Sequence, residues 1–179
     1  MKRKIIISLL CACLFFDCFG QKRNLFWCFG DSAAIDFNNI NNPIATYSVV
    51  NSRGSCASIS DTSGALLFYS AYDADVYLNG GPPFNGGEVY NKSNALMVNG
   101  DLIVMGLWYM EAVIVDNPIS SNQFYLFSIG VTGNYGLYYS MVDMTLDSGF
   151  GGVTQKNVQL LPYAATDGLT CVKHGNGRD

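Results

Sequence analysis

Turn-forming residues occur along the whole chain and limit what it can fold into. Gly, Asn and Pro together account for 40 of its 179 residues. Between them lie short runs of aromatic and β-branched residues, most clearly at 57–60, 66–70, 112–115, 124–129, 137–144 and 158–161. Turn formers at this density interrupt long helices, and short apolar runs between turns are typical of strands. The sequence therefore predicts an all-β fold.

Two of these runs, 66–69 and 124–127, do not alternate between apolar and polar residues. Strands of this kind are typical of sheets that are covered on both faces. This favours either the stacked blades of a β-propeller or, as an alternative, a β-sandwich. Between the first two runs, Asp61 and Gly64 predict a hairpin turn, because an Asp side chain accepts backbone N–H bonds and Gly adopts positive φ. The stretch 78–87, rich in Gly and Pro, is expected to be a surface loop.

The first twenty residues have the pattern of an export signal. Three basic residues at positions 2–4 precede the apolar run 5–16, and small residues occupy positions 18 and 20. This predicts a signal peptide at 1–20, cleaved before Gln21, and a secreted or cell-surface location. A second reading takes Cys13 as the lipidated cysteine of a lipoprotein. The later apolar run 102–115 is broken by Gly106 and Glu111, so no membrane span is expected in the mature chain.

Charge and cysteine content narrow the function classes. The chain after the predicted signal has seven scattered basic residues and thirteen acidic ones, a net charge of −6. No basic stripe is available for a phosphate backbone, which argues against nucleic acid as a partner. Only Cys28, Cys56 and Cys171 remain, enough for one disulfide, and His174 has no neighbour at metal-site spacing. We therefore expect no metal and no cofactor.

Several blocks, taken in order, resemble a known family. They are WCFGDSAAIDFN at 27–38, CASISDTSGALLFYS at 56–70, FYLFSIG at 124–130, GLYYSMVDMTLDSGFGGVTQKN at 136–157 and LTCVKHGNG at 169–177. This pattern is similar to the N-terminal β-propeller-like region of large, gliding-motility-associated Bacteroidetes surface proteins that are exported by the type IX secretion system. The similarity covers nearly the whole mature chain.

The resemblance implies a fold and a function. Residues 21–179 are expected to form an incomplete β-propeller-like domain, with about three blades of four-stranded antiparallel sheet, as the N-terminal fragment of a larger protein. Its remaining blades would then be natural partners, and exposed sheet edges would promote self-association. The implied function is a non-enzymatic interaction or scaffold module at the cell surface, with envelope proteins or extracellular glycans as partners.

Two cysteines depart from the family pattern. Cys28 stands where the family usually has an aromatic residue, and Cys171 where a small residue is usual. We hypothesise that these two residues form a disulfide and that Cys56 stays buried and reduced.

An alternative function is a surface polysaccharide hydrolase or a lectin-like glycan-binding module. The carboxylates available for a glycosidase pair are Asp61, Glu111, Asp143 and Asp167. Asp61 is better explained by a turn and Asp143 by hydrogen bonds at a strand end, so no catalytic residue is assigned. Weak ligand-binding candidates are Trp108 and Tyr109, which could stack on sugar rings, and His174, for which a structural role is favoured.

Overall fold

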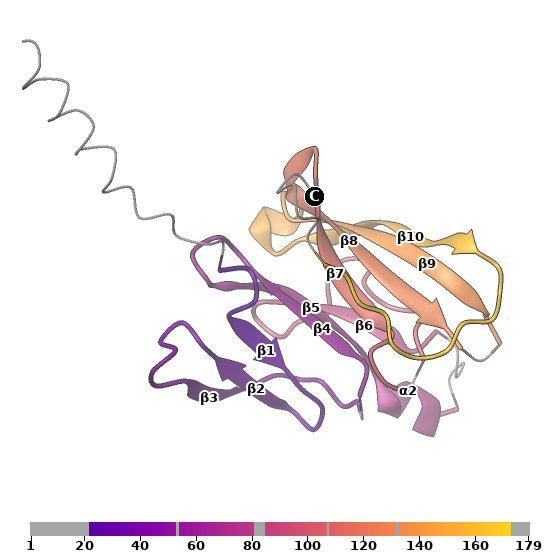
Figure 1. Cartoon of the computed structure of the whole chain (residues 1–179), viewed down its shortest axis with the longest axis horizontal. Helices are drawn as coiled ribbons and strands as arrows, with labels where there is room; N and C mark the ends of the chain where they lie inside the picture. The colour runs from indigo at the N-terminus through magenta and orange to yellow at the C-terminus, as the bar shows by residue number, and fades with distance from the viewer. Residues whose placement is uncertain (1–21, 53, 81–84, 107, 132, 173–179) are drawn as a thin grey trace, which may run out of the picture.

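The computed structural model describes residues 22–52, 54–80, 85–106, 108–131 and 133–172 (Figure 1). The predicted signal peptide and His174 lie outside the described residues. Within those ranges, no helix has the length and apolar character needed to cross a membrane.

The fold consists of three antiparallel sheets, each built from strands that follow one another along the chain. The N-terminal sheet contains β1 (Phe26–Cys28), β2 (Ala33–Asp36) and β3 (Ile44–Tyr47); the central sheet contains β4 (Cys56–Ser60), β5 (Leu66–Tyr72) and β6 (Gly87–Asn91). The C-terminal sheet contains β7 (Ala112–Asn117), β8 (Ser120–Gly130), β9 (Gly136–Asp143) and β10 (Gly152–Leu161). The all-β prediction is confirmed, although only the C-terminal sheet has four strands.

Among the described residues, two short helical segments accompany the strands. Helix α2 (Ala74–Leu78) follows β5, and the 3-10 turn η2 (Asp147–Gly149) lies between β9 and β10. At the two ends of the loop expected at 78–87, Leu78 is the last residue of α2 and Gly87 is the first residue of β6, and residues 81–84 lie outside the described residues.

The hairpin between β4 and β5 forms as the sequence predicts. Asp61 Oδ1 accepts hydrogen bonds from the backbone N–H groups of Ser63 and Ala65, at 2.8 and 3.0 Å, and Gly64 has a φ of 100°. A side chain at Gly64 would also collide with the side chain of Asn38. The turn therefore requires the capping carboxylate of Asp61 and a glycine at position 64.

The central sheet is covered on both faces (Figure 1). On one face, Tyr69 and Ala71 pack with Cys28 and Ala34 of the N-terminal sheet. On the other face, Phe68 meets Phe124 of the C-terminal sheet, with ring centroids 5.4 Å apart. This explains why the run 66–69 has no polar alternation.

The run 124–127 behaves differently. Phe124 and Leu126 are buried between the sheets, whereas Tyr125 and Phe127 are half-buried on the opposite face of β8. The prediction of full cover on both faces is therefore wrong for this strand. Its outward-facing aromatic rings stack on each other, with centroids 5.9 Å apart, so they are shielded without a further layer.

Candidate functional site

One face of the N-terminal sheet is apolar and open to solvent. The strand register pairs Trp27 with Ile35 and Ala33 with Tyr47, which places these side chains on one side of the sheet. Trp27 is 48% exposed and Tyr47 is 70% exposed. We call this surface the outer aromatic face; its residues are Trp27, Phe29, Ile35, Phe37 and Tyr47.

The outer aromatic face is held in place by its own side chains. The Trp27 ring lies 5.0 Å from that of Phe37 and 6.2 Å from that of Phe29. The indole Nε1 donates a hydrogen bond to the carbonyl of Asn24 at 2.8 Å. The opposite face of the same strands carries the buried residues Cys28 and Ala34. A sheet of this kind has one face in the core and one face available for contact.

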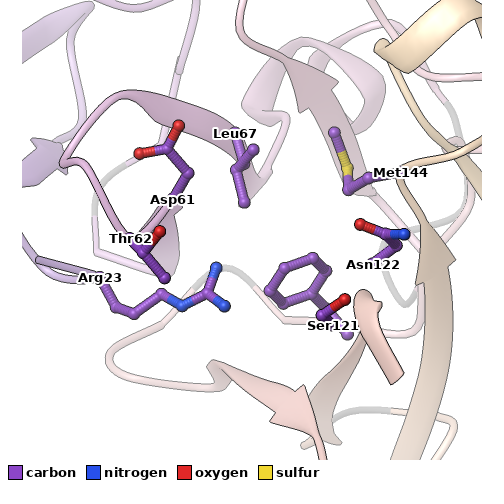
Figure 2. A pocket seen from close by; sticks show the side chains of 8 residues that line it. Arg23, Asp61, Thr62, Leu67, Ser121, Asn122 and Met144 are labelled. Carbon is purple, nitrogen blue, oxygen red and sulfur yellow. The ribbon is translucent and has the colours of Figure 1, made fainter. Parts of the chain in front are cut away.

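A pocket of about 270 Å³ opens between the central and C-terminal sheets (Figure 2). The hairpin turn after β4 forms one side, and the beginning of β8 forms the other. The lining residues are Arg23, Asp61, Thr62, Leu67, Ser121, Asn122, Phe124 and Met144.

Arg23 is fixed at the border of this pocket by three contacts. Its Nη1 donates to the carbonyl of Ser60 at 3.3 Å, and its Nη2 lies 3.2 Å from Asp116 Oδ1. The guanidinium also stands over the Phe124 ring, 5.4 Å from its centroid. The guanidinium charge is therefore already balanced within the protein.

Glu111 is a second feature of interest, since it is buried at the start of β7. Its side chain is fully buried, and neither carboxylate oxygen forms a hydrogen bond of normal geometry within the described residues. Burial and the nearby carboxyl of Asp167 raise the pKa of Glu111 to about 7, although the backbone N–H groups of Gly106 and Trp108 act in the opposite direction. Glu111 is thus a proton-binding group in the neutral range.

The other predicted carboxylates have structural roles. In the described part of the chain, the Asp143 carboxylate accepts three hydrogen bonds. Gln123 donates one at 2.9 Å, and Thr145 donates one from its backbone N–H at 2.9 Å and one from its hydroxyl at 2.6 Å. These bonds lower the pKa of Asp143, and the hairpin bonds likewise lower the pKa of Asp61. The strand-end role predicted for Asp143 is confirmed. The fold brings only Glu111 and Asp167 of the four together among the described residues.

Trp108 and Tyr109 are both exposed, at 51% and 62%. The Tyr109 ring lies against Gly54, where an added Cβ would be 2.5 Å from Tyr109 Cδ1. Neither residue lines the pocket. Whether they bind a ligand stays a prediction.

The hypothesised disulfide between Cys28 and Cys171 is absent. Cys28, Cys56 and Cys171 are all free in the structure, and Cys171 is exposed. Cys28 instead faces the central sheet, where the Cys56 thiol donates to its carbonyl at 2.9 Å. Burial raises the pKa of the Cys28 thiol to about 12. The chain that leads to Cys171 is held by Leu169, whose backbone N–H donates to the carbonyl of Met110 at 2.7 Å, whereas Cys28 is buried between the N-terminal and central sheets.

Sequence reasoning missed both the outer aromatic face and the role of Arg23. The face had a signal, since Trp27 and Phe29, and likewise Ile35 and Phe37, are spaced by two residues as on one side of a strand. Arg23 had none, because its partners Ser60 and Asp116 are distant in sequence.

Within the described residues, no three His, Cys, Asp or Glu side chains gather as a metal site would require. Comparisons with protein-family models, with curated proteins and with solved structures found no match to the chain.

Proposed function

We propose that this chain is a non-enzymatic interaction module of an exported cell-surface protein. The observation that carries the proposal is the outer aromatic face, where large apolar side chains are open to solvent on a sheet whose other face is buried. The face docks the apolar side of another β-sheet.

The internal packing of the molecule supports this kind of partner. The central sheet buries one face against the N-terminal sheet and the other against the C-terminal sheet. A further sheet placed on Trp27 and Tyr47 would extend the same stacking by one layer. Such a sheet belongs to another envelope protein or, if the chain is part of a longer propeller, to a following blade.

A surface hydrolase is less well supported. Glycosidase carboxylates flank an open cleft and stand about 5 to 9.5 Å apart. Glu111 and Asp167 interact closely, but Glu111 is fully buried. A substrate bond would therefore have no access to the Glu111 carboxyl in this structure.

Sedimentation velocity of the mature chain tests the docking surface. In a pure sample, the outer aromatic face of one copy can dock on the same face of a second copy. We therefore expect self-association that increases with protein concentration. Trp27→Thr combined with Tyr47→Thr should abolish it. Ile119→Thr is the matched control, because Ile119 is 91% exposed in the turn between β7 and β8, away from the face. A wild-type chain that stays monomeric at all concentrations would contradict the proposal.

Export is tested separately by the mass of the secreted protein. The expected N-terminus is Gln21. A diacylated protein beginning at Cys13 would favour the lipoprotein reading, and retention of residues 1–20 in the mature protein would refute both.

A further inference from the structure

The pocket at Arg23 has an apolar floor and a polar rim (Figure 2). Phe124 is 1% exposed and Met144 is 9% exposed, and the half-buried Leu67 continues this floor. Thr62, Ser121 and Asn122 are exposed around it. A volume of about 270 Å³ lies just below the roughly 300 to 1,000 Å³ of pockets for drug-sized ligands. The space suits one small molecule or one unit of a polymer.

The charges around the pocket argue for an uncharged ligand. Arg23 is already paired with Asp116, and Asp61 adds a second carboxylate. The turn bonds that lower the pKa of Asp61 keep this carboxylate ionised. A phosphate or sulfate would meet two negative charges with no unpaired cation to balance them, and a cationic ligand would meet Arg23.

The rim offers hydrogen bonds that the protein itself does not use. Within the described residues, the side chains of Thr62, Ser121 and Asn122 form no hydrogen bond. The turn bonds of Asp61 all end on Oδ1, which leaves Oδ2 to accept a bond from a ligand. Hydroxyl, amide and carboxylate groups together match a molecule that both donates and accepts through several hydroxyl groups.

From this arrangement we infer that the pocket binds a single neutral sugar unit, such as the terminal residue of a glycan. The hydroxyl groups of the sugar bond the rim, and its C–H face lies on the floor of Leu67, Phe124 and Met144. This inference rests on the pocket alone and is independent of docking on the outer aromatic face.

Saturation-transfer NMR on the full mature chain tests the inference. The probes are the methyl glycosides of glucose, galactose and mannose, with N-acetylglucosamine. Glucuronate and inorganic phosphate serve as anionic comparisons. At least one neutral probe should bind, and neither anion should compete with it.

Two variants locate the binding. Asn122→Ala removes the amide but keeps the backbone carbonyl that accepts from Met144, and it should weaken binding about threefold to tenfold. Thr62→Trp places an indole over the opening and should abolish binding. Asn41→Ala is the matched control, since Asn41 is exposed in the turn between β2 and β3 and does not line the pocket.

Three results would overturn the inference. They are the absence of any binding by the neutral probes, stronger binding of an anion, and full binding by both pocket variants. Because Thr62 and Asn122 are exposed, both variants are expected to fold as the wild type does, which circular dichroism checks.

Discussion

The N-terminal and C-terminal sheets both place one face on the central sheet, yet their outer faces differ. Trp27 and Tyr47 of the N-terminal sheet are largely open, at 48% and 70%. On the C-terminal sheet, Tyr125 and Tyr139 are half-buried, and their ring centroids lie 5.7 Å apart. The strands of the C-terminal sheet have six to eleven residues, against three or four in the N-terminal sheet. Longer paired strands allow aromatic side chains to cover one another across the sheet.

An apolar outer face of a sheet therefore does not by itself indicate a missing partner. An apolar face on long strands can shield itself, whereas the same residue types on short strands stay in contact with water. The outer aromatic face of the N-terminal sheet is therefore the better candidate for docking.

The largest change in the free energy of unfolding is expected on the inner face of the C-terminal sheet. Phe124→Ala removes a ring that contacts Phe68 and lies beneath the Arg23 guanidinium. Because Phe124 is only 1% exposed between the two sheets, we expect a loss of about 3 to 5 kcal/mol in the free energy of unfolding. Urea denaturation measures it. A loss below about 1 kcal/mol would mean that the central and C-terminal sheets do not share a packed core.

A smaller change in the free energy of unfolding is expected for Glu111→Gln, and its size depends on pH. The pKa of Glu111 in the folded chain, about 7, is above the ordinary value of 4.5 for a Glu carboxyl. The stability that the neutral carboxyl provides is fully present below about pH 4.5 and is lost as pH rises through 7. Glu111→Gln should therefore be more stable than the wild type at pH 8, by about 1 to 3 kcal/mol, and similar to it at pH 4.5.

Thermal unfolding at several pH values tests this expectation. Asp116→Asn is a suitable control, because Asp116 belongs to the same strand but pairs with Arg23. Equal pH profiles for Glu111→Gln and the wild type would show that Glu111 does not titrate in this range.

The outer faces of the two sheets should differ in how much an aromatic ring contributes to the free energy of unfolding. Phe127→Ala removes a ring from the self-shielded cluster with Tyr125 and Tyr139, and should lower the free energy of unfolding by about 1 to 2 kcal/mol. Trp27→Ala, on the open face, should cost about 1 kcal/mol or less. If Trp27→Ala were the more costly change, the face would be part of the fold and not a free surface.

The last prediction compares the alkylation of Cys171 and Cys28 in the folded protein and involves no change in stability. Cys171 is exposed, whereas Cys28 is buried and its thiol pKa is raised to about 12. Iodoacetamide should modify Cys171 in the folded protein and leave Cys28 unmodified until unfolding. Peptide mass mapping distinguishes the two. Rapid labelling of native Cys28 would indicate that the N-terminal sheet separates readily from the central sheet.

Local chemistry in the sequence was enough to predict several elements. The hairpin at Asp61 and Gly64 follows from side-chain capping and a positive φ, and both act within a few residues. The apolar run of β5 predicted a strand with two buried faces, because a polar side chain on either face would lose its hydration. Asp143 could be assigned to a strand end for the same local reason.

Long-range relations could not be predicted in this way. The disulfide hypothesis compared Cys28 and Cys171 with a family pattern, but in the fold both thiols are free, with Cys28 buried against the central sheet and Cys171 exposed. The number of strands in each sheet also depended on pairings that a run of residues does not contain. The family resemblance and the propeller arrangement remain proposals.

The all-β character, the turn after β4 and the apolar content of each strand follow from the amino-acid sequence, because these depend on backbone preferences and on neighbouring residues. The tertiary structure sets which aromatic residues are covered, where Arg23 finds its partners and that Glu111 is buried beside Asp167. Those properties depend on which segments meet in space. Burial, charge pairing and pKa are set by neighbours that are distant along the chain.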